Sequence, residues 1–170
     1  MKAVSIDCTP ASPAKDMDFS TITDDILVGT TPRNEDYARL HLLGVRLVIN
    51  MRLWLGRPPA GNLGSLQYIR LRTFDSPLVP IPTTALIRGT RLALPVIADG
   101  GRVYTHCSRG RHRSVAMAAA ILIGQGLTPE AAMQLIKQRR PAADPEAHHI
   151  RPRIVEFGRV WHSPEMTEAS

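Results

Sequence analysis

The sequence predicts an α/β domain with a mainly parallel central sheet and helices on both of its faces. Apolar stretches with strand character alternate with helical patterns along the chain, as is typical of such a sheet. One of them, VRLVINM at 45–51, is a continuous apolar run of the kind found in strands that are buried on both faces. Another segment, Ser114–Gly124, has hardly a polar face and therefore predicts a buried helix.

The N-terminal part of the domain is predicted to contain a strand and a short helix before the apolar strand. Ile22–Val28 has β character, and Gly29 is expected to end it. A Thr-Pro-Arg sequence then favours entry into a helix at Glu35–Leu43, which Gly44 closes. A glycine thus bounds each of these two elements.

The middle of the chain predicts a strand and a longer helix. Gln67–Thr73 alternates polar and apolar residues, which indicates a half-exposed strand ending at Phe74–Asp75. After a proline-stiffened loop, Thr83 is expected to cap a helix that runs to about Ala98. Pro95 should kink or split this helix, because its ring has no N–H and clashes with the preceding turn.

Four elements are predicted in the C-terminal part. They are a strand at Arg102–His106, the buried helix at Ser114–Gly124, a helix from Thr128 to about Arg140, and a last helical segment from Pro145 to about Trp161. The third begins with a capping threonine, a first-turn proline and a first-turn acid, which together mark a helix start.

Length and composition indicate one globular domain. The chain has 170 residues, of which 44% are hydrophobic and 21% charged. We place the domain at 21–162, between an N-terminal tail at 1–20, expected to be flexible, and a C-terminal tail at 163–170. The start lacks the apolar core of a secretion signal, and the longest apolar run, Val115–Ile123, is too short to cross a bilayer. We therefore expect a cytoplasmic monomer without a membrane span.

Charge and cysteine content restrict the partners. The net charge of +6 favours acidic partners, but no basic helical stripe with interleaved aromatic residues indicates nucleic acid. Two cysteines are too few for a disulfide framework. We interpret Cys8 as an incidental surface thiol, with a resolving role toward an oxidised Cys107 as the alternative.

In the stretch GRVYTHCSRGRHRS, three arginines, Arg109, Arg111 and Arg113, lie between one thiol and a serine. The arginines should repel one another unless an anion lies among them. Between a strand and a helix start, the backbone N–H groups of such a loop form a nest for a tetrahedral oxyanion. Gly110 permits a turn with positive φ, and Arg113 can bind two phosphate oxygens with its planar group. The residues expected to bind phosphate are Ser108, Arg109, Gly110, Arg111, His112 and Arg113.

The same surroundings should activate Cys107. A thiol beside cations at a helix N-terminus has a lowered pKa, so Cys107 is predicted to be a thiolate that attacks phosphorus without a separate base. His106 is expected to order the loop by hydrogen bonding rather than to act as that base. Ser114 can donate a hydrogen bond to the sulfur and help it leave when the thiophosphate intermediate is hydrolysed.

Ester cleavage also needs a proton for the leaving oxygen. Of the aspartates considered, Asp75 alone directly follows a predicted strand and begins a loop. It should therefore share the carboxyl edge of the sheet with Cys107. The alternative for Asp75 is a solvated turn residue.

At these residues the chain resembles the cysteine-dependent dual-specificity protein phosphatases. The family motif His-Cys-x5-Arg-Ser/Thr matches His106, Cys107, Arg113 and Ser114. The general-acid aspartate of the family matches Asp75 in FDSPLVPIP, and the resemblance covers most of 20–160. It implies that Cys107 is the nucleophile, that Arg113 binds phosphate and stabilises the transition state, and that Asp75 protonates the leaving group and then activates water. It also implies a compact phosphatase domain that needs no metal or other cofactor.

Two likenesses leave the substrate open. With His112 before the arginine, the loop is also similar to that of plant and fungal atypical phosphatases that act on inositol pyrophosphates. Phosphatidylglycerophosphate phosphatases have a similar loop and helix, although no membrane-binding segment favours them here. The expected reaction is phosphomonoester hydrolysis on proteins. The enzyme is expected to act on phosphotyrosine or, as a dual-specificity phosphatase, also on phosphoserine and phosphothreonine. The alternative substrate is an inositol (pyro)phosphate or another highly charged small molecule.

Three other functions are less favoured by the sequence. A rhodanese-type sulfurtransferase usually has one residue fewer between its cysteine and arginine than separates Cys107 from Arg113. Nothing supports a catalytically dead phosphate-binding module, since every motif residue is present. A metal site built on His106, Cys107 and His112 lacks a fourth ligand at a suitable spacing.

Overall fold

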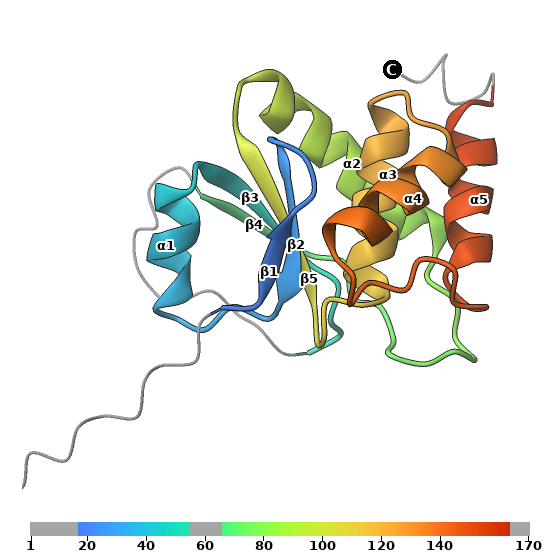
Figure 1. The fold of residues 1–170 in the computed structure, drawn as a ribbon, viewed down its shortest axis with the longest axis horizontal. Coiled ribbons are helices and arrows are strands. Elements are labelled where there is room, and N and C mark those ends of the chain that lie inside the picture. The colour runs from blue at the N-terminus through green and yellow to red at the C-terminus, as the bar shows by residue number, and fades with distance from the viewer. Residues whose placement is uncertain (1–16, 55–65, 164–170) are drawn as a thin grey trace, which may run out of the picture.

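A five-stranded sheet forms the centre of the molecule, with helices on both sides of it (Figure 1). The structure, a computed structural model, describes residues 17–54 and 66–163. The strands are β1 (Phe19–Thr21), β2 (Ile26–Thr30), β3 (Val45–Asn50), β4 (Gln67–Arg70) and β5 (Arg102–Cys107). The helices are α1 (Asp36–Leu42), α2 (Thr83–Ala98), α3 (Arg113–Gly124), α4 (Pro129–Arg139) and α5 (Arg151–Trp161). In this part of the chain, no helix combines the length and apolarity needed to cross a bilayer.

The sheet confirms the predicted parallel core. Its strand order is β1-β2-β5-β3-β4, and every neighbouring pair is parallel except the antiparallel pair of β1 and β2. Thr30 at the end of β2 lies opposite Cys107, and Asn50 at the end of β3 lies between His106 and Arg70 on its two neighbours. The segments that follow these four parallel strands therefore leave the sheet at one common edge, where a ligand is expected.

The sheet separates two apolar cores of unequal size. In Figure 1, α1 lies on one side of the sheet and α2 to α5 lie on the other. Alternation along β2 shows the division, because Ile26 and Val28 belong to the larger core whereas Leu27 belongs to the core under α1. Every residue of α3 from Arg113 to Ile123 is buried, which confirms the predicted buried helix. Residues 47–50 of β3 are also fully buried, as the continuous apolar run predicted.

Strand β2, which was predicted at Ile22–Val28, differs from its prediction at both ends. Residues 22–25 form a turn instead, in which the Ile22 N–H donates to the Ile26 carbonyl at 2.8 Å. Gly29 was expected to end the strand but lies within it. A Cβ at Gly29 would lie 2.6 Å from the Asp18 carbonyl oxygen and 2.8 Å from the Phe19 Cβ. This glycine marks the close approach of β1 rather than a turn.

The expected N-cap of α2 was wrong, and Pro95 does not split the helix. Pro82, not Thr83, is the N-cap residue, and it supplies no side-chain hydrogen bond. The helix continues through Pro95 to Ala98 as one element. Pro95 begins the last turn, where its missing N–H removes one hydrogen bond near the end of the helix instead of interrupting its middle.

The two C-terminal helices show how proline position decides a helix start. The Thr128 hydroxyl accepts a hydrogen bond from the Ala131 N–H at 3.2 Å and caps α4 as predicted. The last helix begins at Arg151 rather than Pro145, with turns before it. Pro152 stands in the first turn of α5, where its missing N–H has no intrahelical partner to lose.

Strand β1 was not predicted at all. It begins at Phe19, inside the segment expected to be a tail, and Met17 before it is buried in the core under α1. A three-residue strand without an apolar alternation is too short for a periodic signal. Cys8 lies outside the described residues.

Candidate active site

The phosphate loop, which we define as residues 107–113, connects the end of β5 to the start of α3. Gly110 at its apex has φ +63°, and a Cβ there would lie 2.8 Å from the carbonyl oxygen of Gly29. Both the backbone conformation and the close approach of β2 therefore require glycine. The loop leads directly into the N-terminus of α3, so its backbone N–H groups and the helix dipole favour an anion there.

The thiol of Cys107 is buried at the base of this loop. Its Sγ lies 3.3 Å from Ser114 Oγ on the first turn of α3. Burial alone raises the pKa of Cys107. The hydroxyl and backbone N–H of Ser114, the charge of Arg113 and the backbone N–H of Arg109 outweigh burial and hold that pKa below the value of a free thiol. These surroundings favour a thiolate.

Arg113 joins the phosphate loop to the segment that follows β4. The residue is 5% exposed, and Nη1 donates to the carbonyls of Met51 at 3.1 Å and Thr73 at 3.0 Å. Nη2 lies 2.7 Å from Asp75 Oδ2. Nε is buried and has no hydrogen-bond partner among the described residues. Two sides of the planar group are thus held in place, and the Nε–H and the second N–H of Nη2 are left for a ligand.

Asp75 and Cys107 line the same pocket, although 32 residues separate them in the sequence. This pocket has a volume of about 330 Å³ and contains five of the seven phosphate-loop residues, Cys107, Ser108, Arg109, Arg111 and His112. The side chain of Asp75 is 63% exposed, so it meets both solvent and the pocket. The structure places the predicted acid beside the predicted nucleophile.

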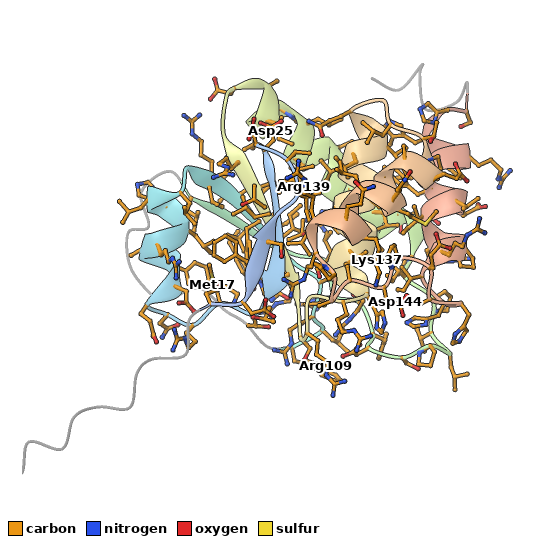
Figure 2. The ribbon with its side chains drawn as sticks, in the orientation of Figure 1. Met17, Asp25, Arg109, Lys137, Arg139 and Asp144 are labelled. Carbon is orange, nitrogen blue, oxygen red and sulfur yellow. The ribbon has the colours of Figure 1, made fainter. Side chains whose placement is uncertain are left out.

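The remaining polar side chains of the loop line the pocket and are at least partly exposed. Arg109 and Arg111 are exposed, and in Figure 2 Arg109 projects from the lower edge of the molecule. His112 is half-buried, with Nε2 3.9 Å from Asp144 Oδ2 and its ring 4.8 Å from that of His149. Burial, followed by the charge of His149, lowers the pKa of His112. A phosphate would therefore meet two arginines and a neutral imidazole here.

His106 is buried next to the nucleophile, and its imidazole is uncharged. Burial and the charges of Arg52 and Arg70 lower its pKa to about 3, although the backbone of Cys107 opposes the shift. The ring stacks on Tyr104 with 5.8 Å between the centroids. Neither ring nitrogen has a partner at hydrogen-bond distance among the described residues, although the backbone of Cys107 interacts with the ring, so the expected ordering of the loop by His106 stays a prediction.

Two residues that sequence analysis missed hold the loop in place. Arg140, only 2% exposed, donates from Nε to the Gly110 carbonyl at 2.8 Å. Its two terminal nitrogens bind the Asp18 carboxylate at 3.0 Å each. On the other side, the Thr31 hydroxyl donates to the Cys107 carbonyl at 3.0 Å. No local pattern links these positions, because each contact depends on tertiary packing.

Among the described residues, no group of three or more histidine, cysteine or acidic side chains is arranged to hold a metal ion. Aspartates and histidines do approach one another near the loop, as His112 and Asp144 do, but they form a pair rather than a ligand set.

Comparison with known proteins identifies the family. No family model matches the chain. The mouse phosphatidylglycerophosphatase and protein-tyrosine phosphatase 1 is 30% identical over 154 residues, covering 89% of this chain and 70% of the relative. Mouse dual specificity phosphatase 28 is 26% identical over 133 residues, covering 75% of this chain and 76% of the relative. The chain belongs to the dual-specificity protein phosphatase family. It is a cysteine-dependent phosphatase, as the motif predicted.

Solved structures share the fold of this phosphatase. A mouse dual specificity phosphatase complexed with zinc tungstate superimposes with a TM-score of 0.78 at 21% identity, covering 93% of this chain and 97% of that one. PTPMT1 in complex with PI(5)P gives a TM-score of 0.73 at 29% identity, covering 89% and 99%. These likenesses extend across most of the chain.

Proposed function

We propose that this phosphatase hydrolyses phosphomonoesters with Cys107 as nucleophile, Arg113 as phosphate-binding group, Asp75 as general acid and Ser114 as a donor to the sulfur. The observation that carries this proposal is the pocket shared by Asp75 and Cys107, with the buried guanidinium of Arg113 bonded to Asp75. A nucleophile, an oxyanion donor and an acid at one site are what the reaction needs.

The first step forms a bond between Cys107 Sγ and phosphorus and breaks the bond from phosphorus to the ester oxygen. The leaving oxygen takes its proton from the Asp75 carboxyl group. Before this step, Arg113 Nη2 is engaged by Asp75. A phosphate dianion competes for that nitrogen and also accepts from the unpartnered Nε, so substrate binding releases the acid from its ion pair.

The second step returns the enzyme to its starting state. The Asp75 carboxylate takes a proton from water, whose oxygen attacks phosphorus as the sulfur–phosphorus bond breaks. Cys107 leaves as a thiolate, which the Ser114 hydroxyl and the helix N-terminus stabilise. Inorganic phosphate is released, and Asp75 is again protonated.

The pH dependence tests these roles. We expect a bell-shaped profile of kcat/KM. Its acidic limb reflects protonation of Cys107 and lies below the pKa of a free thiol, because that pKa is lowered in the fold. Its alkaline limb reflects the need for a protonated general acid, the role proposed for Asp75. Asp75→Asn should abolish the alkaline limb, retain the acidic one, and lower kcat by about 10²–10⁴-fold on an alkyl phosphate.

The exposed Asp24 provides a matched control, because Asp24→Asn makes the same chemical change away from the pocket. It should leave both limbs in place. An alkaline limb that persists in Asp75→Asn would assign the acid to another residue and contradict the proposal.

We infer that phosphotyrosine on proteins is the first substrate class. Beside the phosphate site, Trp54 and Phe74 line a pocket of about 140 Å³ that also includes Asp75 and Arg113. Both residues are largely exposed, at 77% and 51%, so their apolar surfaces are available to a substrate at this pocket. An aromatic ring whose phosphate lies at Cys107 can pack against them.

A second candidate is a densely charged non-protein phosphate, such as an inositol phosphate or a phospholipid headgroup. Arg109 and Arg111 favour it, since both are exposed beside the pocket and neither pairs with a carboxylate among the described residues. The names of two similar proteins, one a phosphatidylglycerophosphatase and one complexed with PI(5)P, support this class.

A substrate panel with Phe74→Ala separates the two candidates. For a phosphotyrosine substrate, loss of the ring contact should lower kcat/KM for a phosphotyrosyl peptide by about tenfold while inositol phosphates are unaffected. The second candidate predicts instead that an inositol phosphate or a phosphoinositide vesicle has a higher kcat/KM than every phosphotyrosyl peptide. Leu42→Ala is the control, because it removes an exposed apolar side chain that lies elsewhere, on α1.

A further inference from the structure

A second basic pocket lies between the end of β4 and the first turns of α2. Its volume is about 890 Å³. It is lined by Tyr68, Arg70, Leu71, Arg72, Pro82, Thr84, Ala85 and Arg88. Three of these eight residues are arginines and none is acidic. The pocket shares no lining residue with the pocket that contains Cys107, so it is a separate site.

The three arginines are not neutralised by the part of the chain that the structure describes. None of the guanidinium groups of Arg70, Arg72 and Arg88 makes an ion pair or a hydrogen bond with another described residue. Arg70 Nε is buried and has no partner within 17–54 and 66–163. A buried donor without an acceptor and three neighbouring cations both disfavour the empty pocket and favour one that holds an anion.

The start of α2 adds positive potential to one wall. This helix has 16 residues, its N-cap Pro82 provides no side-chain acceptor, and its first turn contains no acid. Thr84 in that turn lines the pocket. The partial positive charge of the helix N-terminus is therefore directed to the same side as the arginines.

The strand register gives the distance of this pocket from the catalytic site. Arg70 lies opposite Asn50, and Asn50 lies opposite His106, which precedes the nucleophile. Two strand spacings place the Arg70 backbone about 10 Å from that of His106. The pocket is therefore near the catalytic site without overlapping it. Its two walls, Arg70–Arg72 and Pro82–Arg88, are also the two ends of the segment that carries Asp75.

We propose that the pocket formed by Arg70, Arg72 and Arg88 at the start of α2 is a second anion site that binds a phosphate group. Guanidinium groups and a helix N-terminus are the donors that phosphate oxygens prefer. The bound phosphate is either free inorganic phosphate or a second phosphate of the substrate, and the chemistry of recognition is the same. Binding does not depend on the roles proposed for Cys107 and Asp75.

Site-resolved binding of inorganic phosphate tests the proposal. In wild-type protein, we expect backbone amide NMR signals of Arg72, Thr84 and Ala85 to shift and saturate separately from those of the phosphate loop. The double variant Arg72→Gln/Arg88→Gln should lose the first response and keep the second. Arg70 is left unchanged because it is partly buried.

The matched control is Arg139→Gln/Arg153→Gln, which removes the same charge from α4 and α5 and should keep both responses. The proposal is overturned if the pocket amides do not shift in wild type, or if they shift equally in the double variant. The same titration in Cys107→Ser should show the pocket response unchanged, so a failure of the catalytic assignment does not affect this readout.

Kinetics then distinguishes the source of the phosphate. If it belongs to the substrate, Arg72→Gln/Arg88→Gln should lower kcat/KM about tenfold for a bisphosphorylated substrate and leave an aryl monophosphate unchanged. If it is free phosphate, the double variant should change kcat/KM for both substrates by the same factor.

Discussion

Cys107→Ser is expected to abolish turnover while leaving phosphate binding intact. Serine has nearly the same shape, but its hydroxyl is not ionised at neutral pH, so the sulfur–phosphorus bond cannot form. We expect kcat for an aryl phosphate to fall by at least about 10⁴-fold. Because Arg113 and the backbone of the phosphate loop remain, tungstate or phosphate should still protect the variant against thermal unfolding.

The other cysteine of the chain supplies the control. Cys8→Ser, assayed in the presence of a thiol reductant, should retain the wild-type kcat. Equal rates for wild type and Cys107→Ser would exclude a cysteinyl-phosphate intermediate. Loss of both turnover and oxyanion protection would show instead that the substitution had disrupted the loop.

Arg113→Lys is expected to have the second-largest effect although it keeps the charge. The ammonium group of lysine cannot maintain the two bonds to the Met51 and Thr73 carbonyls while also reaching Asp75 and the phosphate. Loss of oriented donors at the developing charge should lower kcat by about 10²–10³-fold. Because the hydrogen bond from Arg113 to the Thr73 carbonyl holds the segment before Asp75, its loss should also lower the free energy of unfolding.

Arg111→Lys is the matched comparison, because Arg111 lies in the same loop but is exposed. For an aryl phosphate it should change kcat by less than threefold, as expected of an exposed charge. A kcat for Arg113→Lys within threefold of wild type would remove the need for a planar, bidentate group. Urea unfolding of both variants separates the catalytic effect from the effect on stability.

The parts of the fold that follow from sequence are those with local signals. The continuous apolar run became β3, the apolar helix became α3, and the Thr-Pro-Glu start became the cap of α4. Boundaries failed where packing rather than periodicity decided them. Gly29 was interpreted as a stop signal, but β1 packs too closely there for any side chain.

The residues of the candidate site divide in the same way, into those with a local sequence signal and those that only packing brings together. Cys107 and Ser114 are seven residues apart across a tight loop, so the sequence spacing already placed their side chains together. Asp75 was predicted from its position after a strand, since parallel strands share an edge. Arg140 and Thr31 carried no such signal. Their contacts arise from helix ends and loops whose relative positions only the packed structure determines.

Arg140 also bears on the order in which the chain can assemble. Its guanidinium connects Gly110, 30 residues earlier, with Asp18, 122 residues earlier. Contacts of such long sequence separation form late, because the loops that they close cost conformational entropy. During synthesis the thiol emerges well before the residue that fixes the loop above it. The nascent chain therefore passes through a stage in which Cys107 is present but its anion-binding surroundings are incomplete.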